Sequence, residues 1–187
     1  MLSPCSICPA HCCKTYTITV TSFDIFRIAQ NTNKPLESFA TLHPLRMLAY
    51  DPDMVLDIKN ENKRTGPCDT PSVTTDYFLL GLQSHPCTFL GKDNLCTIHK
   101  FAPMTCRRYP FDLSDKLNTR FCPLPSQLLF RLKGPDIQKT EMIRELEAYK
   151  KIVKEWNTNQ ANKVNKGKFG TTEECMEFLM ERTGELL

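Results

Sequence analysis

Apolar residues recur at helical spacing in three segments of the chain. A helix is predicted over residues 21–29, because Thr21 or Ser22 can cap it and its apolar side chains share one face: Ile25, Ile28 and Ala29. The longest pattern covers residues 136–156, with apolar positions at spacings of three and four: Met142, Leu146, Tyr149, Val153 and Trp156. A final helix is predicted after residue 171, because residues 171–174 resemble a capping box. We expect the last two helices to pair as a hairpin against the core.

Two further segments have weaker patterns. Residues 36–49 are predicted to form another helical stretch, interrupted at Pro44 because proline lacks a backbone N–H donor. Residues 157–170 are polar and basic and contain glycine, so we expect a linker or loop between the last two helices.

Two segments have the composition of β-strands, namely residues 54–59 (MVLDIK) and 76–83 (DYFLLGLQ). The segment between them, residues 60–75, is polar and contains glycine and proline, which predicts a loop. A tight turn is expected at residues 91–94 (GKDN), between two short apolar pieces. Together these patterns predict an α+β fold of short strands and helices, followed by the C-terminal helical hairpin.

Composition and charge narrow the functional classes. The chain has 187 residues, of which 41% are hydrophobic and 24% are charged, and these values are ordinary for a globular protein with a core. A net charge of +3, spread along the chain, is too weak to predict binding to nucleic acid or to an acidic membrane. No apolar run approaches the roughly 20 residues that span a bilayer, so we expect no membrane association.

The ten cysteines are the unusual feature of the composition. The first residues contain no basic segment followed by an apolar stretch, so we expect no secretory signal and a cytoplasmic location. In that reducing compartment, clustered cysteines are more often metal ligands or redox groups than disulfides.

Eight of the ten cysteines form two groups, Cys5, Cys8, Cys12 and Cys13 near the start and Cys87, Cys96, Cys106 and Cys122 later. The spacing Cys5-x2-Cys8 lets both sulfurs turn toward one metal. Adjacent residues of an extended chain point to opposite sides, so Cys12 and Cys13 are expected to suit a multi-iron cluster, or two metals, better than one zinc ion. The later spacings match neither ferredoxins nor zinc fingers.

The chain resembles the YkgJ-like cysteine-cluster family, whose shared domain is described as zinc- or iron-chelating. The matching stretches, over roughly residues 5–122, are CSICPAHCC, DIFRIA, CTFL, CTIH and APMTCRRYPF. The family is also similar to the longer flagellin lysine-N-methylases. The resemblance implies a metal-stabilised domain with this ligand set: Cys5, Cys8, Cys12, Cys13, Cys87, Cys96, Cys106 and Cys122.

Other residues near these motifs have plainer interpretations. His11 and His99 are expected to be hydrogen-bonded or surface histidines, because the thiolates already suffice as ligands. Arg107 and Arg108 are interpreted as balancing the negative charge of a thiolate-ligated cluster rather than binding an anionic substrate. Cys175, in the final predicted helix, and Cys68 are interpreted as ordinary residues.

These observations leave three hypotheses for function. The first is an iron–sulfur protein, for example with a [4Fe–4S] cluster, that serves in electron transfer, metal handling or structure; thiolates suit zinc as well as iron. The second is a cluster-dependent enzyme, such as a protein lysine methyltransferase, and the third is a zinc-stabilised interaction module. The partner, a protein or a small molecule, is not identified by the sequence. We expect a metal-binding domain over residues 1–130, with a helical extension over residues 131–187 packed on it.

Overall fold

The computed structural model describes residues 9–45, 51–62, 72–83, 86–117, 122–135, 137–166 and 168–187. The chain forms two compact units, one from residues 1–41 and 81–146 and the other from residues 42–80 and 147–187. Both helices and a small antiparallel sheet are present, which confirms the α+β class. Neither unit is one continuous stretch, and the expected division at residue 130 stays a prediction. No helix in the described ranges is both long enough and apolar enough to cross a membrane.

The first unit is built around α2 (Ser22–Thr32), which confirms the helix predicted at residues 21–29. Its Thr21 cap is reciprocal: Asp24 N donates to Thr21 Oγ1 at 3.2 Å, and Thr21 N donates to the Asp24 carboxylate at 3.1 Å. Ile25 and Ile28 are fully buried, as their shared face predicts. The unit also contains the short helices α1 (His11–Thr15) and α3 (Met104–Arg108) and the 3₁₀ helices η2 (Leu36–Ser38) and η4 (His99–Phe101).

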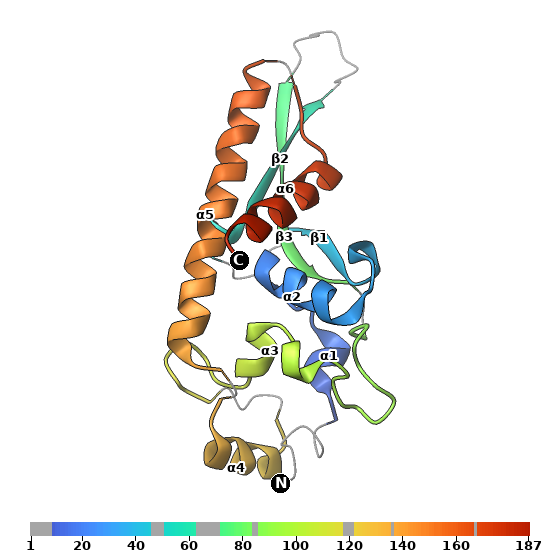
Figure 1. Cartoon of the computed structure of the whole chain (residues 1–187), viewed down its shortest axis with the longest axis vertical. Helices are drawn as coiled ribbons and strands as arrows, with labels where there is room; N and C mark the ends of the chain where they lie inside the picture. Colours follow the sequence, from blue (N-terminus) through green and yellow to red (C-terminus); the bar gives the residue numbers. More distant parts are fainter. Residues whose placement is uncertain are drawn as a thin grey trace. The chain divides into compact units, whose positions relative to one another are not determined.

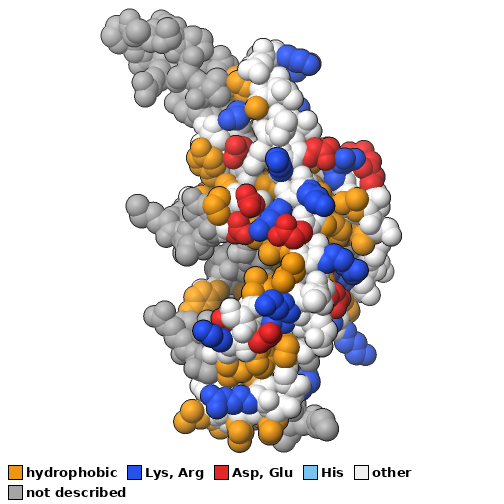
Figure 2. Space-filling view, turned by 90° about the vertical axis from the view of Figure 1, so that its left-hand side faces the viewer, with side chains coloured by type: hydrophobic (Ala, Val, Ile, Leu, Met, Phe, Trp, Pro, Cys, Tyr) orange, Lys and Arg blue, Asp and Glu red, His pale blue; other side chains and the backbone are white. Residues whose placement is uncertain are grey.

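Helix α4 (Leu124–Lys133), also in the first unit, was not predicted from the sequence. Leu124, Leu128 and Leu132 recur every four residues on one face and are 78%, 61% and 77% exposed, whereas Ser126 on the other face is buried. Figure 2 shows hydrophobic side chains gathered at the lower end of the view, where α4 lies. The apolar stripe that normally identifies a core-facing helix therefore points to solvent here.

The sheet has the strand order β1–β3–β2 and consists of β1 (Ala40–Pro44), β2 (Leu56–Asn62) and β3 (Ser72–Leu82). Strands β2 and β3 pair antiparallel, with Leu56 opposite Phe78. Both predicted strands are confirmed, but residues 60–62 and 72–75 belong to them rather than to a loop. Residues 63–71 of the predicted loop, including Cys68, lie outside the described residues.

The helix predicted at residues 36–49 is wrong. Within the described residues 36–45, only η2 is helical, and the chain then enters β1, where Ala40 and Leu42 are buried and alternate with less buried neighbours. Pairing with β3 outweighs the weak local helical pattern, since strand formation depends on cross-strand contacts. Residues 46–50 lie outside the described residues.

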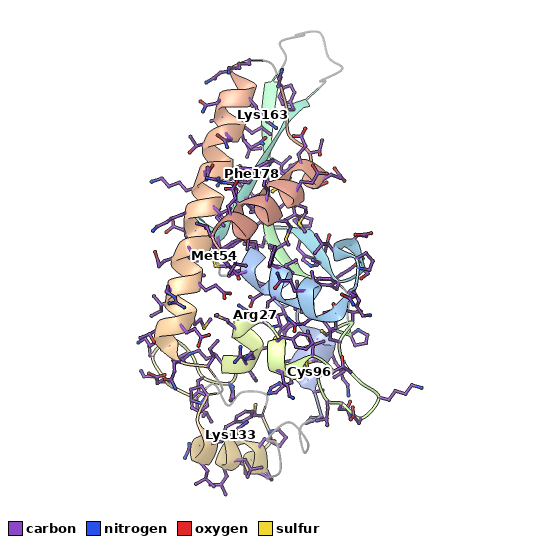
Figure 3. The ribbon with its side chains drawn as sticks, viewed as in Figure 1. Arg27, Met54, Cys96, Lys133, Lys163 and Phe178 are labelled. Carbon is purple, nitrogen blue, oxygen red and sulfur yellow. The ribbon has the colours of Figure 1, made fainter. Side chains whose placement is uncertain are left out.

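The second unit contains most of α5 (Lys139–Val164) and all of α6 (Thr172–Glu185). Thr171 caps α6 as predicted, and the rings of Trp156 and Phe178 pack with centroids 5.4 Å apart; Figure 3 labels Phe178 on α6. Helix α5 extends to Val164, so the linker predicted at residues 157–170 is much shorter than expected. The Lys163–Glu174 ion pair, at 2.8 Å, links the two helices across the remaining turn.

Side chains of α5 occupy the outer edge of β2, and Figure 1 shows the helix running alongside this strand. Asn157 Oδ1 accepts from Asp57 N, and its Nδ2 donates to Val55 O, both at 2.8 Å. Trp156 Nε1 donates to Asp57 O at 2.9 Å. These bonds satisfy groups of an edge strand that would otherwise be available to pair with another chain.

We predict that Asn157→Ala lowers the free energy of unfolding by about 1–3 kcal/mol, because it leaves two partly buried backbone groups without partners, Asp57 N in β2 and Val55 O just before it. Urea unfolding followed by circular dichroism measures the loss. Thr158→Ala is the matched control, because the exposed Thr158 hydroxyl bonds only to Lys154 O within its own helix. An equal loss in both variants would contradict the proposed role of the edge contact.

Candidate metal centre

Six cysteines of the first unit border one cavity of about 120 Å³: Cys12, Cys13, Cys87, Cys96, Cys106 and Cys122. The other walls are mainly apolar and include Ile18, Leu82, Phe89, Ile98 and Phe130. Figure 3 labels Cys96 beside α1 and α3. The prediction that the two cysteine groups meet is confirmed for Cys12 and Cys13, whereas Cys5 and Cys8 lie outside the described residues.

Three backbone contacts bring the two groups together. Thr19 pairs with Gly81, Leu82 N donates to Ile18 O at 3.0 Å, and Cys87 N donates to Cys13 O at 2.7 Å. Cys13 therefore lies opposite Cys87 because of the pairing at the end of the strand.

Cys12 and Cys13 lie on α1, and their sulfurs are 3.8 Å apart. The expectation that they point to opposite sides is wrong, because it assumed an extended chain and this segment is helical. Two thiolates bound at about 2.3 Å to one tetrahedral metal ion lie roughly 3.8 Å apart. The pair is therefore spaced as two ligands of one metal ion.

Cys87 and Cys96 flank the predicted tight turn, and Cys96 pairs with Leu90 in an antiparallel bridge. Asn94 has a left-handed backbone, with φ of 62°, and Gly91 N donates to Leu95 O at 2.8 Å. A side chain at Gly91 would meet Leu95 O at 3.2 Å and the Asp93 carboxylate at 2.7 Å, so the close turn favours glycine.

The carboxylate of Asp24 holds the helix that carries Cys106. It bonds to the start of that helix and not to Cys106 itself. Asp24 is 1% exposed and accepts from Met104 N at 2.9 Å, at the start of the short helix that carries Cys106. Arg27 pairs with the same carboxylate at 2.8 Å and also with Glu145. The structure thus gives a physical role to the DIFRIA stretch: Asp24 ties α2 to the cysteine segment, and Arg27 ties α2 to Glu145 of α5.

Arg108 does not have the charge-balancing role expected from the sequence. It is 2% exposed, and its guanidinium donates to the backbone oxygens of Asp112 and Ile137 and pairs with Asp115. These contacts hold the loop that follows α3. For Arg107, charge balance stays a prediction.

Cys122 lies just before α4 and is 7% exposed. Its sulfur is 3.8 Å from the hydroxyl of Tyr109, which also borders the cavity. Gln127 Nε2 donates to Cys122 O at 2.6 Å and holds the backbone of this cysteine. His99 borders the cavity as well, whereas the ring of His11 packs edge-on against Tyr16.

Burial keeps most of the thiols protonated in the metal-free protein. It is the main cause that raises the pKa of Cys87, Cys96 and Cys106, and the negative charge of Asp24 adds to the effect at Cys106. Within the adjacent pair, the hydrogen bond from Cys13 lowers the pKa of Cys12 to about 7, and the same bond raises that of Cys13. Metal binding to these thiols would therefore release protons.

The six cysteines border one shared cavity. Among the described residues, no three His, Cys, Asp or Glu side chains are arranged to hold a single metal ion. Cys175, by contrast, is buried in α6 of the second unit, where burial raises its pKa to about 12.

A family model described as "Putative zinc- or iron-chelating domain", named CxxCxxCC, matches residues 4–123. The match covers all eight cysteines of the two groups and ends before Cys175. No curated protein and no solved structure matches the chain.

We predict that Glu145→Gln changes the pH dependence of stability. Burial and the nearby Asp24 raise the pKa of Glu145 to about 7, from 4.5. A raised carboxyl pKa gives stability that is fully present below about pH 4.5 and is lost as the pH rises through 7. Relative to the wild type, the always-neutral glutamine should gain up to about 3 kcal/mol over this range, at about 1.4 kcal/mol per pH unit.

Thermal or urea unfolding at several pH values between 4.5 and 8 measures the stability of the variant and of the wild type. Subtracting one from the other at each pH removes the pH effects that the two proteins share. Glu147→Gln, at an exposed position on the same helix, is the control and should follow the wild type. A difference between Glu145→Gln and wild type that does not vary with pH would contradict the prediction.

Proposed function

Because the chain belongs to the CxxCxxCC family of zinc- or iron-chelating domains, we propose that its cysteine cavity binds an iron–sulfur cluster. The observation that carries the proposal is the distribution of six cysteines around one apolar-walled cavity of about 120 Å³. A structural zinc ion needs four ligands at one point, about 2.0–2.3 Å from the metal. A cluster spreads its iron atoms over a larger volume, so its four cysteine ligands need not converge.

The cavity residues fit the chemistry of such a cluster. The proposed ligands are drawn from the cysteines of both groups: Cys5, Cys8, Cys12, Cys13, Cys87, Cys96, Cys106 and Cys122. Thiolates are soft ligands that suit iron–sulfur clusters, and apolar walls limit the access of water. The positive charge of the metal would compensate the cost of ionising buried thiols, which is high in the metal-free protein.

The bound cluster would supply one-electron exchange, and the chain would supply its ligands, its apolar surroundings and its position. We therefore propose a role in electron transfer, metal handling or structural stabilisation in a reducing cytoplasm. The partner is proposed to be a protein or a small molecule that reacts with the cluster.

The 3.8 Å separation of the sulfurs of Cys12 and Cys13 bears on the type of cluster. In a [2Fe–2S] cluster with four cysteines, each iron carries two of them, so the adjacent pair can share one iron without moving. In a [4Fe–4S] cluster the four cysteines are divided among four irons, so the pair would have to separate. The same separation also favours zinc as a second candidate, because one zinc ion can bind both thiolates.

Anaerobic purification followed by iron, sulfide and zinc analysis and visible spectroscopy tests the proposal. The expected result is a brown protein with iron and acid-labile sulfide. The ratio of iron to chain separates two-iron from four-iron clusters. A colourless protein that contains zinc would overturn the iron–sulfur proposal and favour the second candidate, and a metal-free protein would overturn both.

We predict that Cys106→Ser loses most of the bound metal and unfolds at a lower temperature than wild type, because metal binding contributes to folding free energy. Cys175→Ser should retain the metal, because Cys175 does not border the cavity. Metal analysis and thermal unfolding of both variants make the comparison. Equal metal retention in the two variants would remove Cys106 from the ligand set.

A further inference from the structure

We propose that the Tyr109 hydroxyl donates a hydrogen bond to the metal-bound thiolate of Cys122 and thereby raises the reduction potential of the centre. The inference rests on the proposed function, and it assigns to Tyr109 a positioning role rather than a ligand role. Its basis is the 3.8 Å contact between the phenol oxygen and the sulfur, both of which border the cavity.

The direction of this hydrogen bond depends on the state of Cys122. A neutral thiol carries a proton and can donate weakly to the phenol oxygen. A metal-bound cysteine is a thiolate and has no proton to donate, so between these two groups only Tyr109 can then be the donor. Metal binding therefore reverses the direction of this hydrogen bond, so that Tyr109 and no longer Cys122 is the donor. The two side chains do not need to move apart for this change.

Both ends of the contact are held by neighbouring residues. Tyr109 N donates to Thr105 O at 2.9 Å, and the preceding Arg108 is fixed by the carbonyl oxygens of Asp112 and Ile137. On the other side, Gln127 holds the backbone of Cys122. A hydrogen bond between two groups positioned in this way loses little conformational freedom on formation, as is common for groups that support metal ligands.

The effect of this hydrogen bond on the reduction potential follows from the charge that reduction adds. Reduction adds negative charge to the metal and its sulfur ligands, and a hydrogen-bond donor stabilises the more negative state more strongly. Hydrogen bonds to the sulfurs are among the factors that set iron–sulfur potentials. Removing the hydroxyl should therefore make the centre harder to reduce.

The test compares anaerobically purified wild type, Tyr109→Phe and Tyr77→Phe. Tyr77 is half-exposed on β3 and does not border the cavity, so it controls for loss of a phenol hydroxyl. Iron and sulfide should be equal in all three proteins. The midpoint potential should shift to a more negative value in Tyr109→Phe alone, and its charge-transfer bands should also shift. Equal metal content with an unchanged potential would overturn the inference.

A second variant covers the case in which Tyr109→Phe loses its metal. Site-specific incorporation of 3-fluorotyrosine at position 109 keeps the ring and makes the hydroxyl a stronger donor. The midpoint potential should then rise above that of the wild type, and a potential that stays the same or falls would refute the hydrogen bond.

The measurements also separate this inference from the proposed function. If the purified protein contains zinc and no iron, the iron–sulfur proposal fails, and the hydrogen bond is then tested in the cobalt-substituted protein. The thiolate-to-cobalt charge-transfer band should shift in Tyr109→Phe and not in Tyr77→Phe. An unchanged band would overturn the role of Tyr109 for that metal as well.

Discussion

The cysteine site depends on the contacts that the buried carboxylate of Asp24 makes. It accepts hydrogen bonds from the backbone N–H groups of Thr21 and Met104 and an ion pair from Arg27. A charge buried without partners is very costly, and these three donors offset that cost. Because the carboxylate bonds to α2 and to the start of α3 together, the position of Cys106 is set by a helix about 80 residues earlier in the chain.

The same carboxylate also makes the metal-free site unfavourable for thiolates. Its negative charge adds to burial in raising the pKa of Cys106, and the guanidinium of Arg108 is taken up by backbone carbonyls and Asp115. A bound cation would supply positive charge that offsets the charge of ionised thiols here. Asp24 fixes where Cys106 lies, and ionisation of the Cys106 thiol would depend on a bound metal.

The elements that could be predicted from the sequence are those with a local signal. Thr21 and Thr171 cap their helices through side-chain contacts with residues three positions later, so the sequence contains both partners. The last residues of α5 are polar, and the sequence has no capping pattern there that predicts where the helix ends. This end is stabilised by tertiary contacts, as Lys163 pairs with Glu174 and lies over the ring of Trp156. Strand β1 was mistaken for a helix for a similar reason, because its partner strand is distant in the sequence.

Within the cysteine site, the choice of cysteines was predictable and their geometry was not. The Thr19–Gly81 bridge and the hydrogen bond from Cys87 N to Cys13 O tie two distant segments together and place Cys13 beside Cys87. Most of the chain between these segments belongs to the second unit. The number of residues that separate the two cysteine groups therefore carries no information about the metal. Cys13 itself lies on the helix α1, so the site depends on this helix and on the backbone contacts to residues 81, 82 and 87 as much as on the cysteines themselves.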